Sequence, residues 1–279
     1  MNVCILRGPR AEQSVIDNAI AALKAHGVDG WEAQRDGPMS AITARLKDTA
    51  LVVTLGGDGT FLAGGRLAAP KGIPVLGVNL GRLGFLTEVE AEELEDGLAR
   101  FLDGKYRIEE RTILQVSVSR GSRTVAKAIG LNEVVLDHSG EARMLRVEID
   151  VGGQAVGVID ADGVMVSTAT GSTAYALASG GPILEPTLRD LVLVPMNPFA
   201  LTVRPIVFPP GQNISLSVVR GPGEMRIDGG SGLAVETGDT VRCGSHPRRL
   251  KVVRFSPPEA FYRRLGDKLG WGRPLVPNK

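Results

Sequence analysis

The chain has 279 residues, of which 43% are hydrophobic and 23% are charged, and 32 basic against 31 acidic side chains leave a net charge of +1. This length suffices for about two domains with buried cores, and the balanced charge gives no electrostatic reason to expect a nucleic-acid partner. Only Cys4 and Cys243 are present, which argues against a disulfide framework and favours a reducing compartment. No apolar run reaches the ~18 residues of a membrane-spanning helix, so the sequence predicts a cytoplasmic protein without a membrane partner.

The first hundred residues alternate between short apolar runs and segments with helical spacing. This pattern predicts strands at residues 2–6, 51–55 and 74–78, and helices at residues 13–26, 40–47, 61–68 and 91–102. Such alternation, with nearly continuous apolar strands, is typical of a doubly wound parallel sheet, as in Rossmann-like α/β domains. Ligands of these sheets bind beyond the carboxyl ends of the strands.

After about residue 105 the period of the pattern changes. Residues 114–119, 145–151 and 214–218 alternate apolar and polar side chains, which predicts antiparallel strands with one face toward water. Helical spacing returns at residues 257–269. We therefore expect an α/β domain over residues 1–105, a mainly antiparallel β domain over residues 106–256, and a helical tail over residues 257–279 that returns to the first domain.

A glycine-rich loop, residues 56–60 with the sequence Gly-Gly-Asp-Gly-Thr, directly follows the apolar strand at 51–55. Glycines let backbone N–H groups approach an anionic oxygen, and a helix that begins near Thr60 adds its positive dipole end. A carboxylate among these donors would repel a phosphate, so Asp58 is interpreted as a group that accepts a proton or holds a cation. The loop lacks the Lys of a P-loop and the third glycine of the dinucleotide fingerprint. The alternative is an ordinary strand-to-helix turn in which Asp58 caps the helix.

A second polar segment, residues 160–182, places many hydroxyl side chains and glycines behind Asp160 and Asp162. Small hydroxyl groups can bond a purine edge or a ribose, and Tyr175 offers a stacking face with a polar tip. Asn132 and Glu133 put an amide and a carboxylate at the start of another predicted strand, although a simple turn before a strand also explains this pair. The three scattered histidines and two distant cysteines suggest no transition-metal site.

Together these segments closely resemble the NAD kinases of bacteria. The resemblance covers nearly the whole chain and rests on residues 56–60, 77–87, 132–133, 162–182, 193–196, 204–205 and 268–271. The Gly-Gly-Asp-Gly sequence is shared with diacylglycerol, sphingoid and phosphofructo-kinases, whereas Asn-Glu followed by Asp-Gly and Thr-Gly-Ser-Thr-Ala-Tyr is much more specific. The resemblance implies a phosphotransferase that moves a phosphoryl group from ATP, or from polyphosphate, to the 2′-hydroxyl of the adenosine ribose of NAD, giving NADP. It also implies Mg²⁺ or another divalent cation, and a homodimer or homotetramer in which a neighbouring subunit helps complete the NAD site.

The same resemblance implies roles for the residues of the glycine loop. Asp58 would accept the proton of the ribose hydroxyl. Its neighbours would lie near the phosphates: Gly56, Gly57, Gly59 and Thr60. A basic residue that the family often carries three positions after the loop threonine is Ala63 here, and Arg66 is expected to reach the phosphates instead.

Further residues are expected at NAD by the resemblance. In addition to Asp58 and Gly59 they are Asn132, Glu133, Arg143, Asp160, Asp162, Thr170, Thr173, Ala174, Tyr175, Ala176, Leu177, Ala178 and Gly230. Some relatives carry Arg at the position of Asp160 and Gln at that of Gly230, so these two contacts depart from the family pattern. Glu133 is also expected to be a neighbour of Mg²⁺ or of a phosphate.

Two other functions stay open. A lipid kinase of the diacylglycerol or sphingoid type would share the glycine loop, but the hydroxyl-rich segment and the absence of an exposed amphipathic membrane stretch count against it. A non-catalytic module that senses NAD would keep the binding site without the transfer reaction, but Asp58 and Glu133 are both present.

Overall fold

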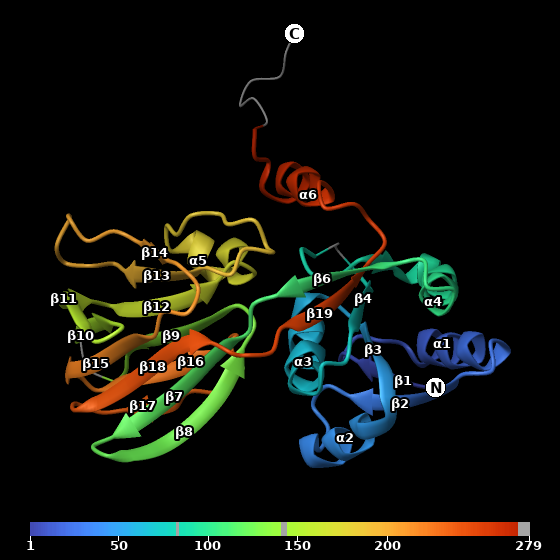
Figure 1. The fold of residues 1–279 in the computed structure, drawn as a ribbon, viewed down its shortest axis with the longest axis horizontal. Helices are drawn as coiled ribbons and strands as arrows, with labels where there is room; N and C mark the ends of the chain where they lie inside the picture. The colour runs from blue at the N-terminus through green and yellow to red at the C-terminus, as the bar shows by residue number, and fades with distance from the viewer. Residues whose placement is uncertain (82–83, 141–143, 273–279) are drawn as a thin grey trace, which may run out of the picture. The chain divides into compact units, whose positions relative to one another are not determined.

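The computed structural model describes residues 1–81, 84–140 and 144–272, and it divides the chain into two compact units. The first unit consists of Met1–Glu109 together with the chain from Lys251 onward, and the second consists of Glu110–Leu250. The second unit is thus inserted between two sequence segments of the first, as the colours of Figure 1 allow the reader to follow.

The first unit is built on one sheet with the strand order β2-β1-β3-β4-β19-β6, to which β5 adds by pairing with β4. The strands are β1 (Asn2–Arg7), β2 (Asp29–Gln34), β3 (Thr49–Leu55), β4 (Val75–Asn79), β5 (Val89–Glu90), β6 (Arg107–Arg111) and β19 (Leu250–Arg254). The helices are α1 (Gln13–Ala25), α2 (Met39–Arg45), α3 (Asp58–Ala68), α4 (Leu94–Leu102) and α6 (Ala260–Leu269), with short 3-10 turns at Leu46–Asp48, Ala69–Lys71 and Ala91–Glu93. The pairs β1–β2, β1–β3, β3–β4 and β4–β19 are parallel. The predicted α/β domain with a parallel sheet is confirmed.

Helices cover both faces of this sheet. Successive side chains of a strand point to opposite faces, so each strand contributes to two layers. On one face, Val53 of β3 belongs to a buried cluster with Ile16 of α1 and Leu98 of α4. On the other face α3 approaches closely at Gly64, where a Cβ atom would lie 2.4 Å from the side chain of Thr54. Burial on both sides explains why β1, β3 and β4 have nearly continuous apolar sequences.

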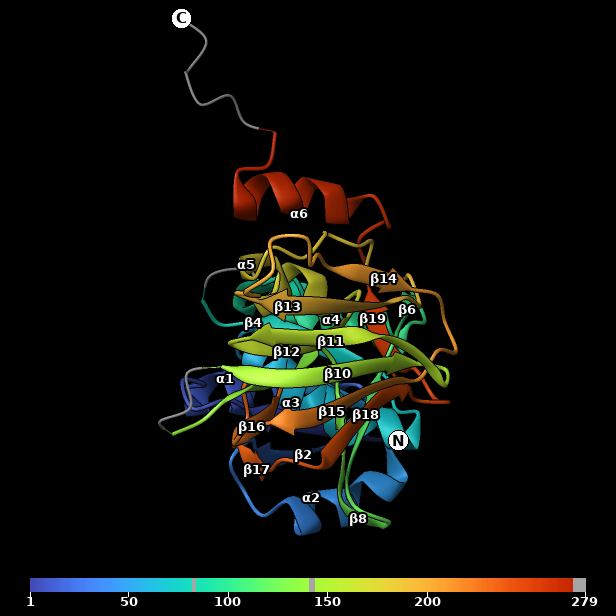
Figure 2. The same ribbon diagram turned by 90° about the vertical axis from the view of Figure 1, so that its left-hand side faces the viewer.

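The second unit contains two six-stranded sheets whose paired strands are antiparallel, with the orders β11-β10-β15-β18-β7-β8 and β14-β13-β12-β9-β16-β17 (Figure 2). The strands of the first sheet are β7 (Leu114–Arg120), β8 (Arg123–Gly130), β10 (Leu145–Val151), β11 (Gln154–Ala161), β15 (Ile214–Arg220) and β18 (Asp239–Ser245). Those of the second are β9 (Glu133–His138), β12 (Gly163–Thr168), β13 (Leu191–Met196), β14 (Ile206–Phe208), β16 (Gly223–Ile227) and β17 (Leu233–Val235). A 3-10 turn at Gly171–Thr173 and the short helix α5 (Tyr175–Ala178) follow β12. The predicted antiparallel β region is confirmed.

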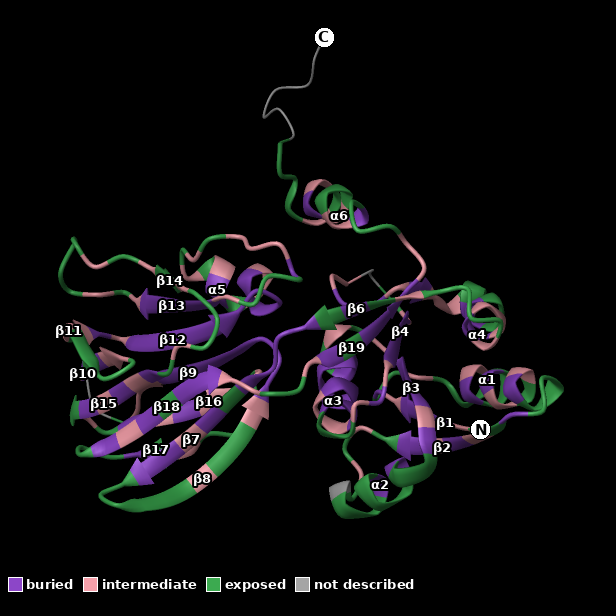
Figure 3. Ribbon diagram, viewed as in Figure 1, coloured by how far each residue is buried: buried purple, intermediate pink, exposed green. Residues whose placement is uncertain are grey.

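The core of this unit lies between the two sheets. Val118 and Leu216 of the first sheet join Leu136 and Val166 of the second in one buried cluster. A smaller cluster on the other side of the second sheet includes Ala176 of α5. Because β12 and β13 are therefore covered on both faces, they are buried along most of their length (Figure 3). None of the described helices has the length and apolar character needed to cross a membrane.

Candidate functional site

The glycine loop joins the buried strand β3 to α3, which begins at Asp58, two residues before the predicted start. The backbone N–H groups of Thr60 and Phe61 donate to the carbonyl of Gly57 at 2.9 and 3.1 Å. The N–H groups of Asp58 and Gly59 precede Thr60, the first donor of the helix, so they stay available to an anion. The loop therefore presents backbone donors at the positive end of a helix of 11 residues.

Thr60 explains why glycine is needed around it. A Cβ atom at Gly56 or at Gly8 would lie 2.4 Å from the hydroxyl oxygen of Thr60. The two glycines thus let the end of β1 and the loop close around the buried threonine side chain.

Both carboxylate oxygens of Asp58 are hydrogen-bonded within the first unit. Oδ2 accepts the N–H of Phe85 at 3.0 Å, and Oδ1 accepts the N–H of Leu86 at 3.1 Å. A Cβ atom at Gly84 would lie only 1.8 Å from Oδ1, so this close approach requires glycine. The N–H donors hold the carboxylate in one orientation and leave lone pairs on each oxygen for another donor.

A cavity of about 550 Å³ adjoins the glycine loop. Gly57, Gly59 and Thr60 line it, together with two basic residues from other loops, Arg10 and Arg35. Arg35 also forms a bidentate ion pair with the neighbouring Asp36. Sequence reasoning missed both arginines, because they lie more than 20 positions before the loop in the chain.

Arg66, the basic residue that the sequence suggested for the phosphates, lies in the last turn of α3. The glycine loop is at the opposite end of this helix, and Arg66 is not among the residues that line the cavity. Positive charge at the cavity comes instead from Arg10 and Arg35.

Asn79, at the end of β4, is a further lining residue; the sequence placed its segment at the ligand-binding end of the sheet but gave Asn79 no role of its own. Its Nδ2 donates to the carbonyl of Gly81 and to Glu90 Oε2, both at 2.7 Å. These two acceptors fix the orientation of the amide, and its Oδ1 is buried without a hydrogen-bond partner. The signal in the sequence was the position of Asn79 at the carboxyl end of a predicted parallel strand.

In the second unit, Asn132 and Glu133 lie at the start of β9 and are held through their backbone. The carboxylate of Asp228 accepts the N–H groups of Leu131 and Asn132 at 3.0 and 2.8 Å. The carbonyl of Asn132 accepts the N–H of Thr168 at 2.8 Å. The structure thus brings the Asn-Glu pair to the end of β12, where the hydroxyl-rich segment begins, and adds Asp228, which the sequence did not identify.

The side chains of this pair are buried but incompletely bonded. Asn132 Oδ1 and Glu133 Oε2 are both shielded from solvent and have no hydrogen-bond partner. Burial, together with the negative charge of Asp228, raises the pKa of Glu133 to about 7. Two adjacent buried acceptors without partners are costly in an isolated protein and are typical of a site completed by a ligand.

The other predicted contacts of the second unit lie in three places. Thr170 accepts from Arg111 at 3.4 Å, and Thr173 donates to the carbonyl of Thr170 at 3.4 Å, both next to the 3-10 turn. Ala174 caps the helix α5, which consists of Tyr175–Ala178, and Tyr175 is 47% exposed. Asp162 accepts from the side chain of Asn197 at 2.8 Å.

Asp160 and Gly230 occupy different surroundings. Asp160 forms a bidentate ion pair with Arg146 at 2.9 and 2.7 Å and a further one with Arg220. The hydrogen bonds from Arg146 hold the pKa of Asp160 below its ordinary value. Gly230 lies in the exposed turn after β16, and Arg143 lies outside the described residues.

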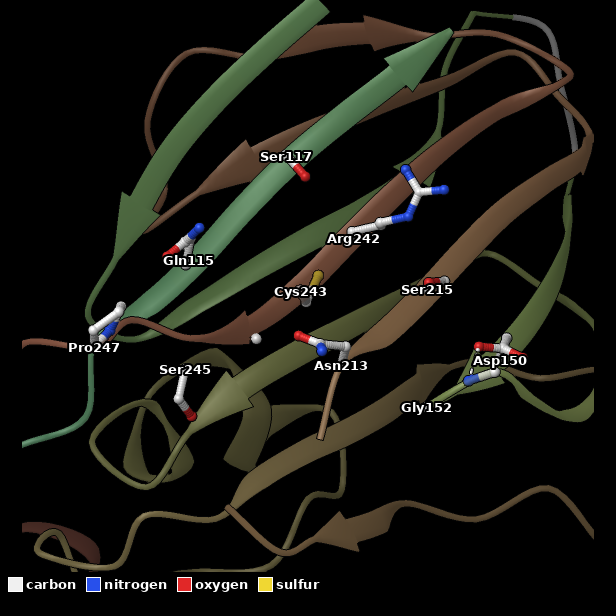
Figure 4. A pocket seen from close by; sticks show the side chains of 12 residues that line it. Gln115, Ser117, Asp150, Gly152, Asn213, Ser215, Arg242, Cys243, Ser245 and Pro247 are labelled. Carbon is white, nitrogen blue, oxygen red and sulfur yellow. Dashed lines mark hydrogen bonds between the residues drawn. The ribbon is translucent and has the colours of Figure 1, made fainter. Parts of the chain in front are cut away.

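Another cavity of the second unit, of about 620 Å³, lies apart from these residues. Its floor is the wet face of β7, β18 and β15, with Gln115, Ser117, Arg242 and Ser215 side by side on neighbouring strands (Figure 4). None of the predicted site residues that the structure describes lines this cavity, so its size alone does not identify a catalytic site.

Comparisons with known proteins agree on one family. Residues 19–106 match the ATP-NAD kinase N-terminal domain and residues 131–255 match the ATP-NAD kinase C-terminal domain. The chain is 43% identical over 238 residues to an NAD kinase of Heliobacterium modesticaldum, covering 85% of this chain and 84% of the relative. It is 38% identical over 254 residues to an NAD kinase of Treponema denticola, covering 90% and 89%.

Solved structures show the same fold. An NAD kinase of Archaeoglobus fulgidus in complex with ATP superimposes with a TM-score of 0.79 at 25% identity, covering 98% of this chain and all of that chain. Yeast NADH kinase complexed with NADH gives a TM-score of 0.89 at 23% identity, covering all of this chain and 90% of that chain. From its two domain matches and from relatives that align over most of its length, the chain belongs to the NAD kinase family.

Proposed function

We infer that the protein is an NAD kinase, which transfers the γ-phosphoryl group of ATP to the 2′-hydroxyl of the adenosine ribose of NAD and releases NADP and ADP. The observation that carries this proposal is Asp58, a carboxylate at the first residue of α3 whose two oxygens each accept one backbone N–H. The lipid-kinase and NAD-sensing alternatives are not favoured, because the relatives are NAD kinases.

Asp58 is proposed as the proton acceptor. A ribose hydroxyl is a poor nucleophile at neutral pH, so its proton must leave as the new O–P bond forms. The proton passes from the hydroxyl to a free lone pair of Asp58, while the bond between the γ-phosphorus and the β–γ bridging oxygen breaks. A positioned base of this kind contributes about 10²–10⁴-fold to the rate.

The cavity beside the glycine loop is proposed to hold the phosphates of the donor. The N–H groups of Asp58 and Gly59 lie at the start of α3, and Arg10 and Arg35 line the same cavity. Backbone donors and guanidinium groups stabilise the negative charge of a transferring phosphoryl group. ATP and polyphosphate both carry anionic phosphoryl groups that these donors can bind, and an assay with each of them identifies the phosphoryl donor.

A divalent cation, Mg²⁺, is proposed as the cofactor. Mg²⁺ is commonly bound by one or two carboxylates together with substrate phosphates. The described part of the chain has no group of three or more His, Cys, Asp or Glu side chains that could hold a metal ion alone. Glu133 fits a shared site, since its buried Oε2 is an oxygen ligand without a partner. When bound, the cation would neutralise charge on the phosphoryl oxygens.

NAD is proposed to bind at the Asn132–Glu133 pair. The unpartnered Oδ1 and Oε2 are acceptors for hydroxyl or amino groups of the ligand. The exposed ring of Tyr175 supports a stacking contact, and the family resemblance supports Asp162 and the residues 173–178.

A homo-oligomer and a cytoplasmic location are proposed as well. Phe199 and Leu201, in the segment between β13 and β14, are 78% and 83% exposed, which is typical of residues covered by a partner. Cys4 and Cys243 are both buried free thiols, as expected in a reducing compartment.

The decisive experiment measures NADP formed by purified protein with NAD, Mg²⁺ and either ATP or polyphosphate. Asp58→Asn is expected to lower kcat by about 10²–10⁴-fold with little change in the KM of NAD. The matched control is Asp17→Asn on the exposed face of α1, which is expected to keep full activity. Wild-type protein that binds NAD but forms no NADP with either donor would refute the proposal, and unchanged turnover of Asp58→Asn would remove Asp58 from the base role.

A further inference from the structure

The turn that bonds Asp58 is itself held from its opposite side. Residues 84–88 precede β5, and the N–H groups of Phe85 and Leu86 bind the carboxylate of Asp58. N–H and C=O groups of an extended turn point in different directions, so the carbonyls of the same residues need other partners. These partners are Arg254 of β19 and Arg264 of α6.

Arg254, the last residue of β19, supplies two of the bonds. Its Nη1 donates to the carbonyl oxygens of Leu86 at 3.0 Å and Thr87 at 3.3 Å. The Arg254 side chain is 1% exposed and is the largest of the fully buried side chains. A guanidinium group fits this place because its planar fork can bond several oxygens at once, which a lysine cannot do.

Arg264, in the middle of α6, supplies a second link. Its Nη1 lies 3.5 Å from the carbonyl of Phe85, and its Nη2 donates to Glu88 Oε2 at 2.9 Å. The side chain is 14% exposed. The C-terminal helix therefore reaches the residue whose N–H binds Asp58 (α6 in Figure 1).

Glu88 provides the negative charge that keeps both guanidinium groups in place. Its Oε2 accepts from Arg254 at 3.0 Å and from Arg264 at 2.9 Å, and its Oε1 accepts the N–H groups of Phe255 and Ser256 at 2.8 and 2.6 Å. Arg254 also donates to Glu109 at 3.1 Å. Apart from Arg254 Nη2, which is buried without a hydrogen-bond partner, the cluster of Glu88, Arg254 and Arg264 pairs opposite charges and bonds one face of the turn.

We propose that Arg254 and Arg264 are positioning residues for the phosphoryl transfer: by binding the carbonyls of residues 85–87, with Glu88 as counter-charge, they fix the two N–H groups that orient the carboxylate of Asp58. This inference rests on the proposed function and extends it to two residues that lie about 200 positions away from Asp58 in the sequence. Arg264 acts through the turn and touches neither substrate nor the reacting atoms.

Arg264 is the residue to change, because its partly exposed side chain lies on a surface helix and can be removed with less risk to folding than Arg254. The variants are Arg264→Ala, Arg264→Lys and the neighbouring control Arg263→Ala, which is exposed on the same helix. Each is made in the wild type and in Asp58→Asn. Two kinds of measurement are made. Steady-state kinetics give kcat and KM for NADP formation, and amide hydrogen exchange reports on the segment that contains Phe85 and Leu86.

We expect Arg264→Ala to lower kcat by about tenfold, with both KM values changed less than about twofold, because a small displacement of a catalytic group costs rate more than binding. Arg264→Lys should recover part of the loss, and Arg263→Ala should resemble the wild type. In the Asp58→Asn background the effect of Arg264→Ala should nearly vanish, because the group that it positions is gone. The amides of Phe85 and Leu86 should exchange faster in Arg264→Ala and Asp58→Asn, but not in Arg263→Ala.

The proposal is overturned if kcat of Arg264→Ala equals that of the wild type, or if the same tenfold loss persists in Asp58→Asn, since a general structural defect would act in both backgrounds. If Asp58→Asn turns over too slowly to measure, unchanged exchange at Phe85 and Leu86 in Arg264→Ala refutes the proposal instead. If the wild type forms no NADP, the proposed function fails, whereas the exchange measurement still decides whether Arg264 holds the turn.

Discussion

Glu88 of the first unit and Glu133 of the second both have a carboxylate shielded from solvent, but they differ in how its charge is stabilised. Glu88 accepts four hydrogen bonds, two of them from guanidinium groups. Burial raises its pKa, but the charge of Arg254 and the bonds from Arg264 and Ser256 outweigh this and hold the pKa below its ordinary value. Among the residues that the structure describes, no cation offsets the burial of Glu133, and its pKa is raised to about 7.

This difference in hydrogen bonding distinguishes Glu88, a structural carboxylate, from Glu133, which the proposed function assigns to ligand binding. Nearly every bond that Glu88 can make is already made inside the first unit, so its removal should mainly affect stability. Glu133 keeps a buried oxygen without a protein partner, and this is a cost that a bound hydroxyl, amine, cation or water would remove. Three substitutions test this distinction.

Glu88→Gln is expected to have the largest effect. The substitution leaves Arg254 and Arg264 next to a neutral amide, and an uncompensated buried charge costs about 3–5 kcal/mol in the free energy of unfolding. Urea denaturation of the variant at pH 7.5 measures this loss, with the exposed Glu95→Gln of α4 as the control. A stability equal to that of the control would show that Glu88 is not the structural member of the comparison.

Gly84→Ala extends the comparison to Asp58, whose bonds also come from within the unit. The new Cβ atom would lie 1.8 Å from Asp58 Oδ1, so either the carboxylate or the turn must move. We expect kcat to fall by about 10²-fold, which is the rate effect of a displacement of about 1 Å at a reacting group. The control is Gly266→Ala in α6, where the nearest atom is 3.7 Å away. Equal turnover of the two variants would contradict the close fit at Asp58.

Glu133→Gln should have the smallest effect on the ligand-free protein, and its sign depends on pH. A glutamate whose folded pKa is raised above 4.5 to about 7 binds more protons when folded, so its contribution to stability is lost as the pH rises through this interval. The variant lacks this loss and should become more stable relative to the wild type between pH 5 and pH 8, by up to ~3 kcal/mol. Urea midpoints of both proteins at several pH values test this, with Glu148→Gln on the exposed face of β10 as the control. Parallel pH profiles for wild type and Glu133→Gln would show that the charge of Glu133 is already compensated.

Glu88 has the opposite pH dependence. Its lowered pKa stabilises the fold above the ordinary pKa range of glutamate, and this stabilisation is lost in acid.

The helices and strands that the sequence predicted are those in which apolar residues recur with an unambiguous helical or strand spacing. The apolar run of β3 and the glycines after it located the loop of Asp58 in advance, and alternation located β7, β10 and β15. The edge strand β2 was not predicted, because only Trp31 and Ala33 of its six residues are buried. β8 was missed for a similar reason, since nearly all of its residues are at least partly exposed.

The partners of the site residues could not be predicted from the sequence. Asp58 is bonded by backbone N–H groups, and a backbone donor has no side chain that marks it in the sequence. The bonds between Glu88 and Arg264 join positions that are 176 residues apart. Gly84 lies in the segment 77–87 that carries the family resemblance, but nothing in the sequence indicated its close approach to Asp58.

The discontinuous first unit has a consequence for biosynthesis. β19 lies between β4 and β6, so the sheet of the unit that contains Asp58 is incomplete until the residues after the inserted unit have left the ribosome. Synthesis of that insertion takes on the order of ten seconds at ordinary elongation rates. During this delay Glu88 lacks both of its arginine partners, and the nascent chain has the Asp58 carboxylate without the residues that hold its turn. A ribosome-bound chain that ends before Arg254 is therefore expected to fold its β unit first and to gain the phosphoryl-transfer geometry only with its last segment.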